Sequence, residues 1–182
     1  LSKVLFPRYI IFFATFLLIP AAYLIKNLKN KLILGIVIVA YIISVGYYDY
    51  TIIADFAHIP FPPVDRGQYL EGWPAGWGMK DIISIAREES KHKPVLIIAE
   101  GNFGLAGDVL DVLLRKDDTI SIKGYWPLDK PQLIENQPEL DTKTVYIVLA
   151  HKFDYPSDWP MKLVKKYEKP GHESVTYLYE LT

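Results

Sequence analysis

Two uncharged apolar stretches near the start of the chain constrain its fold more than any other feature. They are residues 9–25 (YIIFFATFLLIPAAYLI) and residues 32–48 (LILGIVIVAYIISVGYY). A helix that crosses a bilayer needs about 20 apolar residues, so each stretch is at the short end of this range. Arg8 and Lys26 flank the first stretch and can extend it by snorkelling, and a membrane helix tolerates Pro20. We therefore predict a membrane α-helical hairpin of two transmembrane helices.

Charge is divided unevenly between this apolar part and the rest of the chain. Residues 1–48 contain five basic residues and no acid, whereas residues 49–182 contain all 21 acids and the other 15 basic residues. This asymmetry is typical of a membrane part joined to a water-soluble part. The slightly acidic soluble part argues against nucleic acid as a partner. The absence of cysteine excludes disulfides, thiolate metal sites and a cysteine nucleophile.

The loop between the two apolar stretches, residues 26–31 (KNLKNK), contains three lysines. Loops rich in Lys and Arg face the cytoplasm, so we expect this loop inside the cell and the residues after Asp49 outside it. The prediction is a multi-pass protein of the plasma membrane, embedded in the lipid bilayer, with an extracytoplasmic C-terminal domain. The alternative is a helical hairpin buried in a soluble protein, which would have to enclose two tandem stretches that contain no acid.

Residues 51–78 separate the apolar part from the rest and contain four prolines and four glycines. Turn residues at this density predict a segment without regular structure. The predicted domain organisation is therefore two transmembrane helices in residues 1–50, a Pro/Gly-rich juxtamembrane segment in residues 51–78 and an extracytoplasmic α/β domain in residues 79–182.

The hydrophobic pattern of the C-terminal part alternates between amphipathic runs, typical of helices, and short continuous apolar runs, typical of buried strands. Ser157 or Asp158 as N-cap, with Pro160 in the first turn, predicts a helix near the end of the chain. Helices are predicted at 79–92, 105–116 and 157–169, strands at 94–99, 119–126, 144–150 and 174–181, and a polar, proline-containing stretch at 127–142. Strands separated by helices predict a small α/β domain with a mainly parallel, roughly four-stranded sheet.

The turn that follows the strand at 94–99, EGNFGLAG (100–107), has the position of a phosphate-binding turn. Its spacing is G-x-x-G-x-x-G rather than G-x-G-x-x-G, and Glu100 and Asp108 would repel a phosphate. A dinucleotide site is therefore not favoured, and a tight turn is the simpler interpretation. Because ligands of α/β sheets bind at the carboxyl ends of strands, Glu100 and Asn102 are candidate substrate contacts.

The segment DRGQYLEGWPAGWG (65–78) combines an acid, an arginine, aromatic rings and glycines. Aromatic faces beside a carboxylate and a guanidinium are suited to a sugar or a lipid phosphate, and glycines let a ligand approach the backbone. The candidate substrate-binding residues are Asp65, Arg66, Tyr69, Trp73 and Trp77. Two other interpretations stay open: the tryptophans anchor the domain at the membrane surface, and the arginine holds a loop.

Other residue types suggest no further site. The histidines, at positions 58, 92, 151 and 172, are scattered without ligand spacing, so no metal is predicted. No serine lies in G-x-S-x-G, and no pair of acids can be chosen for glycoside hydrolysis from spacing alone. No cofactor is predicted.

Several short motifs together resemble a known family. They are P-R-Y (7–9), D-R-x-Q-Y (65–69), G-W-P-A-G-W-G (72–78), E-G-x-F-G (100–104) and G-Y-W-P-L (124–128). With two apolar spans and an α/β domain, the chain resembles the C-terminal end of bacterial integral-membrane glycosyltransferases of the GT-C fold, related to dolichyl-phosphate-mannose protein mannosyltransferases.

This resemblance implies an enzyme that moves a sugar from a polyprenyl-phosphate carrier to an extracytoplasmic acceptor. In that family the catalytic acid lies in the first external loop, which this chain does not contain, so the resemblance implies catalytic residues outside the chain and further transmembrane helices as partners. A fragment of a longer membrane protein is expected rather than a cleaved signal peptide, because a second span follows the first. One alternative is a membrane-anchored extracytoplasmic α/β binding or assembly domain without catalysis. Another is a soluble-type enzyme tethered to the membrane.

Overall fold

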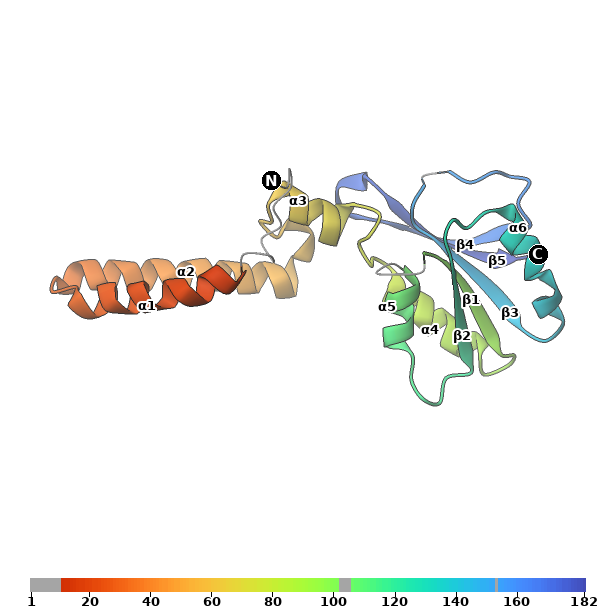
Figure 1. Cartoon of the computed structure of the whole chain (residues 1–182), viewed down its shortest axis with the longest axis horizontal. Helices are drawn as coiled ribbons and strands as arrows, with labels where there is room; N and C mark the ends of the chain where they lie inside the picture. Colours follow the sequence, from red (N-terminus) through yellow and green to blue (C-terminus); the bar gives the residue numbers. More distant parts are fainter. Residues whose placement is uncertain (1–10, 102–105, 153) are drawn as a thin grey trace. The chain divides into compact units, whose positions relative to one another are not determined.

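The structure is a computed structural model that describes residues 11–101, 106–152 and 154–182. The chain divides into two compact units, Leu1–Asp65 and Arg66–Thr182. Helices make up the regular structure described in the first unit, and a mixed α/β arrangement makes up most of the second (Figure 1).

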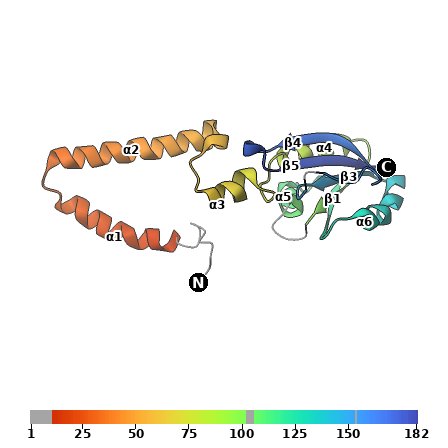
Figure 2. The ribbon, with the colours of Figure 1, turned by 90° about the horizontal axis from the view of Figure 1, so that it is seen from above.

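Two apolar helices dominate the first unit. Helix α1 comprises Ile11–Asn27 and helix α2 comprises Lys31–Ala54, and a short turn joins them (Figure 2). Asn30 caps α2, because its side-chain oxygen accepts hydrogen bonds from the backbone N–H groups of Leu32 (3.0 Å) and Ile33 (3.3 Å). The structure confirms an apolar helix at each predicted stretch, and α2 continues six residues beyond its predicted end at residue 48.

Nearly all the described apolar side chains of these two helices are exposed, and Leu34 is half-buried. In α2, for example, Tyr41 is 68% exposed and Ile53 is 85% exposed. Among the described residues, α2 is the one helix long and apolar enough to cross a membrane, and Phe13–Asn27 is a shorter apolar helix. A signal sequence near an N-terminus has the same length and composition as such a helix. The described residues do not enclose these helices, in contrast to the buried-hairpin alternative.

The prediction that residues 51–78 lack regular structure is wrong. The segment contains the 3-10 turn η2 (Phe56–His58), the helical turn α3 (Pro63–Arg66) and the π-helical turn η3 (Gly67–Glu71). Proline is compatible with the first turn of a helix, where its missing N–H has no intrahelical partner, so Pro63 begins a helix instead of preventing one.

A five-stranded mixed sheet forms the centre of the second unit. Its order is β2-β1-β3-β5-β4. Strands β1 (Val95–Glu100), β2 (Ile120–Tyr125) and β3 (Thr144–Leu149) are parallel, whereas β5 (Val175–Leu181) runs antiparallel to both β3 and β4 (Met161–Glu168). The α/β class is confirmed, but the sheet has five strands instead of four, and both pairings of β5 are antiparallel.

This difference arises from residues 157–169, which the sequence pattern predicts as a helix. They contain strand β4, an edge strand that pairs with β5 and has an irregularity between Leu163 and Lys165. Pro160 precedes the strand instead of starting a helix. Residues 162–166 of β4 are exposed. Charged side chains on an edge strand, here Lys162 and Lys166, discourage pairing with other chains. Pairing with β5 therefore overrides the local helical propensity of lysine and leucine.

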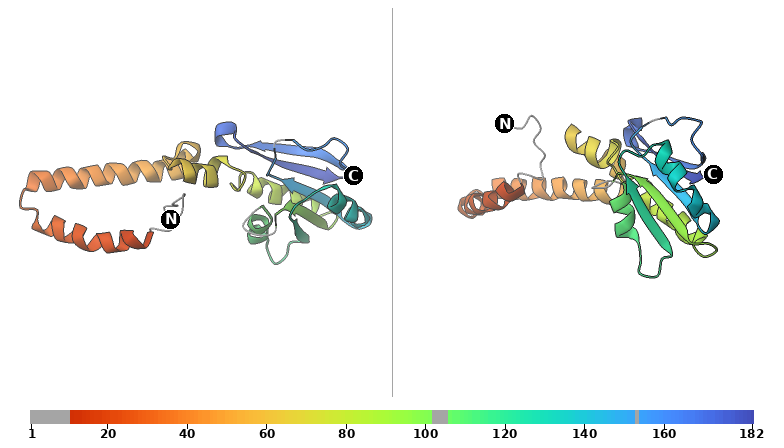
Figure 3. Two further views of the ribbon diagram at one scale, coloured as in Figure 1. Left: turned by 45° about the horizontal axis from the view of Figure 1, so that its top comes forward. Right: turned by 45° about the vertical axis from the view of Figure 1, so that its right-hand side comes forward.

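Helices cover both faces of the sheet (Figure 3). Helices α4 (Met79–Glu89) and α5 (Ala106–Leu113) pack on one face, and α6 (Lys130–Glu135), followed by the 3-10 turn η4 (Gln137–Asp141), belongs to the other. Because successive side chains of a strand point to opposite faces, Ile97 enters the core beneath α4 while Leu96 and Ile98 enter the opposite core.

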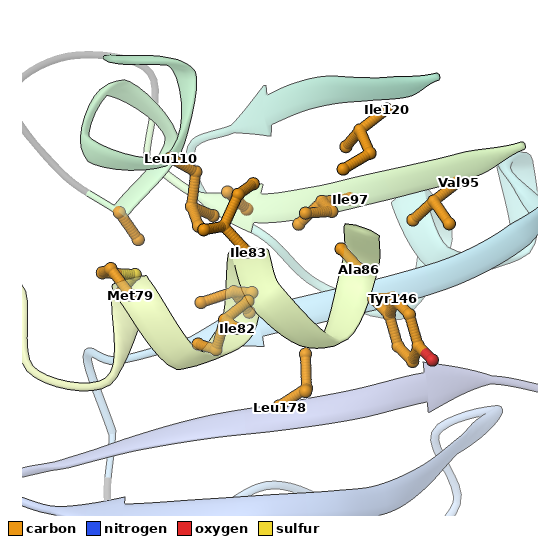
Figure 4. Packing of buried hydrophobic residues seen from close by; sticks show 13 residues of the cluster. Met79, Ile82, Ile83, Ala86, Val95, Ile97, Leu110, Ile120, Tyr146 and Leu178 are labelled. Carbon is orange, nitrogen blue, oxygen red and sulfur yellow. The ribbon is translucent and has the colours of Figure 1, made fainter. Parts of the chain in front are cut away.

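The core beneath α4 is drawn in Figure 4. It contains Met79, Ile82, Ile83 and Ala86 of α4, Leu110 of α5 and residues of β1, β3 and β5, all buried. The helix predicted at 79–92 is thus confirmed as α4, which ends three residues earlier. Helices α6 and η4 lie in the stretch at 127–142, to which the pattern assigned no element.

Candidate functional site

The carboxyl ends of the three parallel strands meet at one edge of the sheet. The chain passes from β1 through α5 to β2, which lies on one side of β1. It then passes through α6 to β3, which lies on the other side of β1. The direction in which strands are added to the sheet therefore reverses, and the switch point lies between β1 and β3. In open α/β sheets a ligand typically binds in the crevice at the carboxyl ends of the strands beside such a switch point.

Glu100, the last residue of β1, connects the ends of β1 and β3. Its side chain is 6% exposed, and Oε2 accepts hydrogen bonds from the backbone N–H groups of Ala150 (3.0 Å) and His151 (2.9 Å). The hydroxyl of Tyr155 donates a third hydrogen bond to the same oxygen, at 3.3 Å. These contacts give Glu100 a structural task, because the carboxylate fixes the chain that leaves β3.

Three ring side chains lie over this edge, and we call Trp73, Trp126 and His151 the Trp–His platform. The ring centroid of His151 lies 5.0 Å from that of Trp73 and 5.1 Å from that of Trp126, and both contacts are close to perpendicular. Trp73 is 40% exposed and Trp126 is 51% exposed. With Glu100 and neighbouring alanines, the three rings line a small hollow at the strand ends.

An aromatic cluster surrounds Tyr155, whose hydroxyl contacts Glu100. The ring of Tyr155 contacts the rings of Trp159, Tyr177 and Tyr179 at centroid distances of 5.8, 5.9 and 6.3 Å. Burial, followed by the nearby charge of Glu100, raises the pKa of the Tyr155 hydroxyl well above its ordinary value. Tyr155 therefore stays neutral at physiological pH and keeps the proton that it donates to the carboxylate.

Of the residues predicted as substrate contacts, the structure brings Trp73 and Glu100 to the same hollow. Asn102 lies outside the described residues, so its predicted role has no structural description. Asp65 is buried and belongs to the first unit. Tyr69 is 44% exposed and Trp77 is half-buried, and neither lines the hollow.

Arg66 forms an ion pair with Glu71 inside the segment that precedes Trp73. The Nε atom donates to Oε1 of Glu71 at 2.7 Å, and Nη2 contacts the same oxygen. This contact corresponds to the alternative in which the arginine holds a loop.

A second hollow lies beside the turn that resembles a phosphate-binding turn. It is lined by Gly101, Gly107, Asp108, Asp111, Ile122 and Gly124. Two carboxylates at its rim disfavour a phosphate. The expectation that the turn does not bind a dinucleotide stays a prediction.

Sequence reasoning missed His151, Trp126 and Tyr155. The first two could have been found by the signal that selected Glu100, which is a position at the carboxyl end of a parallel strand. Trp126 directly follows β2 and His151 is the second residue after β3, and side chains at these positions converge on one edge. Tyr155 lies further along the loop, and only the fold brings its hydroxyl to Glu100.

The arrangement is suited to binding. Exposed aromatic faces attract the C–H groups of a sugar or the chain of a lipid, and the imidazole and carboxylate supply hydrogen-bonding groups. Among the described residues, no group of three His, Asp or Glu side chains could hold a metal ion. Comparisons of the chain with protein-family models, curated proteins and solved structures found no match.

Proposed function

We propose that this chain is the C-terminal portion of a membrane glycosyltransferase that transfers a sugar from a polyprenyl-phosphate carrier to an extracytoplasmic acceptor. In this proposal the catalytic residues lie outside the chain, and the α/β domain binds carbohydrate on the Trp–His platform. The observation that carries the proposal is the platform itself, with two half-exposed tryptophans and a histidine over a carboxylate at the strand ends.

The chemistry of the platform favours carbohydrate over a small charged metabolite. Trp73 and Trp126 present large apolar surfaces to solvent, where a sugar ring can stack its C–H face. His151 lies between them and can exchange hydrogen bonds with hydroxyl groups. Oε2 of Glu100 is occupied by two backbone N–H groups and so has a structural role, which is consistent with binding in this domain and catalysis elsewhere.

The apolar helices support a location in the membrane. Side chains of α1 and α2 such as Phe16 (69%) and Tyr41 (68%) are exposed, and lipid or further helices of a longer protein would cover them. The lysine-rich turn between the helices favours a cytoplasmic position, so the α/β domain would lie on the other side.

Cysteine labelling tests this topology, because the chain has no cysteine of its own. In intact cells, a membrane-impermeant maleimide should label a Glu88→Cys variant of the α/β domain readily. A Lys29→Cys variant of the turn between the helices should react only after the membrane is permeabilised. Labelling of both positions without permeabilisation would contradict the proposed topology, as would recovery of the chain in the soluble fraction without detergent.

Platform variants test the proposed binding role. With the full chain in lipid nanodiscs, we expect measurable affinity for at least one of polyprenyl-phosphate mannose, glucose or arabinose, and no transfer to an acceptor by this chain alone. Trp73→Ala and Trp126→Ala should each weaken this affinity about tenfold, which corresponds to about 1.4 kcal/mol of lost ring contact.

Tyr69→Ala is the matched control for these variants. Tyr69 is exposed to the same degree as Trp73 and lies in the same predicted segment, but it does not line the hollow. A loss of affinity in Tyr69→Ala without one in Trp126→Ala would move the site to the juxtamembrane segment. Sugar transfer by the chain alone would show that the catalytic residues lie within it.

The same platform would also serve a membrane-anchored binding domain without any associated catalysis. The observation that favours this second candidate is the engagement of Glu100 Oε2 by two backbone N–H groups, because it gives the carboxylate at the platform a structural role instead of a catalytic one. The two candidates differ in the longer protein: variants of the platform should reduce sugar transfer there in the first case, and no transfer should exist in the second.

A further inference from the structure

Lys169 is a fully buried lysine at the end of the β4–β5 hairpin. Its side chain is 1% exposed, and Nζ donates hydrogen bonds to the backbone carbonyl oxygens of Gly72 (3.0 Å) and Trp73 (3.2 Å). Lysine is almost never fully buried without a specific partner, because an ammonium loses its hydration there. Burial lowers the pKa of Lys169 to about 8, which reflects this loss. Because burying the ammonium of Lys169 is unfavourable, we expect the contacts that it makes to have a specific role.

Ser174, on the other side of the same turn, extends the contact by one residue. Its hydroxyl donates to the carbonyl oxygen of Glu71 at 2.7 Å, and the turn is closed by a hydrogen bond from Lys169 N to Ser174 O. We call Lys169 and Ser174 the hairpin clamp. The clamp binds three successive carbonyl groups, those of Glu71, Gly72 and Trp73, from a segment about 100 residues away along the chain.

The segment whose carbonyl groups the clamp binds is also fixed by contacts within itself. Gly72 N donates to Gly67 O at 2.8 Å, and a Cβ atom at Gly72 would lie only 2.0 Å from that oxygen. The turn of the hairpin also packs closely, since a Cβ atom at Gly171 would lie 3.0 Å from the side chain of Glu71. The backbone at Trp73 therefore has little freedom, and its indole ring is directed to His151.

We propose that Lys169, with Ser174, is a positioning residue that fixes Trp73 against His151 in the Trp–His platform. A packing role alone would be met by methionine or leucine, whereas carbonyl oxygens that must be held in place require a donor. An ammonium satisfies two of them at once. The consequence for carbohydrate affinity rests on the proposed function, whereas the positioning of the ring does not.

The test compares Lys169→Met and Ser174→Ala with Lys162→Met, an exposed lysine of β4, in the full chain in detergent micelles at pH 7. The readout is the indole N–H resonance of Trp73, assigned by its loss in Trp73→Phe. We expect this resonance to shift or broaden in the first two variants and to stay unchanged in the control. The resonance of the buried Trp159, in the opposite core, should stay unchanged in all three.

A matched binding measurement separates this proposal from the proposed function. Affinity for the polyprenyl-phosphate sugar should fall about tenfold in Lys169→Met and by less in Ser174→Ala. If Lys169→Met does not fold, Ser174→Ala decides, because it deletes one hydroxyl. An unchanged Trp73 resonance in every folded clamp variant would overturn the proposal. A shifted resonance, with no sugar binding even in the unaltered chain, would support the positioning role and contradict the proposed function.

Discussion

Replacing Glu100 with alanine should lower the free energy of unfolding of the α/β domain by about 3 kcal/mol. The substitution removes an acceptor from two backbone N–H groups, those of Ala150 and His151, and from the hydroxyl of Tyr155. A buried donor that loses its partner costs about 1–3 kcal/mol, and bonds to a charged acceptor are at the upper end of this range. Urea unfolding of the full chain in detergent, followed by near-ultraviolet circular dichroism, measures the loss.

Two variants control for this result. Glu100→Gln keeps one carbonyl oxygen as acceptor, so it should lose about 1 kcal/mol. Glu88→Ala changes an exposed acid of α4 and should leave the free energy of unfolding unchanged within the error of the measurement. Hydrogen exchange at Ala150 and His151 should accelerate in Glu100→Ala. Equal losses in the alanine and glutamine variants, or unchanged exchange, would show that the carboxylate does not hold the loop after β3.

The stability of the α/β domain should rise by about 2 kcal/mol between pH 7 and pH 9.5 because of Lys169. In the folded state the pKa of Lys169 is lowered to about 8 from its usual value of 10.5. Between these two pKa values the unfolded chain binds more protons than the folded one, so raising the pH favours folding. Below pH 8 both states are protonated, and the cost of burying the ammonium is present in full.

Unfolding free energies of the unaltered chain and of Lys169→Met across this range check the prediction. The variant should lack the rise. Tyr155 and Tyr167, whose pKa values burial raises in the folded state, oppose this rise only as the pH approaches the ordinary tyrosine pKa of about 10, because the unfolded chain then loses its phenolic protons first. The same slope in both proteins would assign the rise to other groups, and a flat profile in the unaltered chain would show that Lys169 keeps its ordinary pKa.

Both effects act on the framework beneath the platform. Glu100 holds the chain that carries His151, and Lys169 holds the chain that carries Trp73. The two rings come from segments far apart in the sequence, and each depends on a buried polar group for its position. Binding at the strand ends should therefore be sensitive to changes that make no contact with a ligand.

The local patterns of the chain predicted most of its helices and strands within a few residues. Continuous apolar runs marked β1 and β3, because a strand buried on both faces excludes polar side chains. The 3.6-residue period of apolar residues predicted α4, because Ile82, Ile83 and Ala86 lie on the face that packs against the core. These elements were predictable because each depends on side chains that are neighbours along the chain.

The errors occurred where a distant segment decided the local structure. The residues of β4 have the composition of a helix, yet they pair with β5 and form an antiparallel edge. Pro63 resembled a helix breaker in a turn-rich segment and instead begins α3. In the candidate site, Trp73 and Glu100 were found from their residue type and position. The sequence does not single out His151, because its ring partners, Trp73 and Trp126, lie in other parts of the sequence.

The sequence alone predicted the apolar helices, the α/β class of the second unit, and Glu100 and Trp73 as candidate site residues. Only the tertiary structure decided the strand order, the assembly of the Trp–His platform and the partners of Glu100 and Lys169. The physical reason is the range of the interactions. Hydrophobic periodicity is a property of adjacent residues, whereas a buried carboxylate or ammonium takes the partner that folding brings to it, 50 residues away for Glu100 and 97 for Lys169.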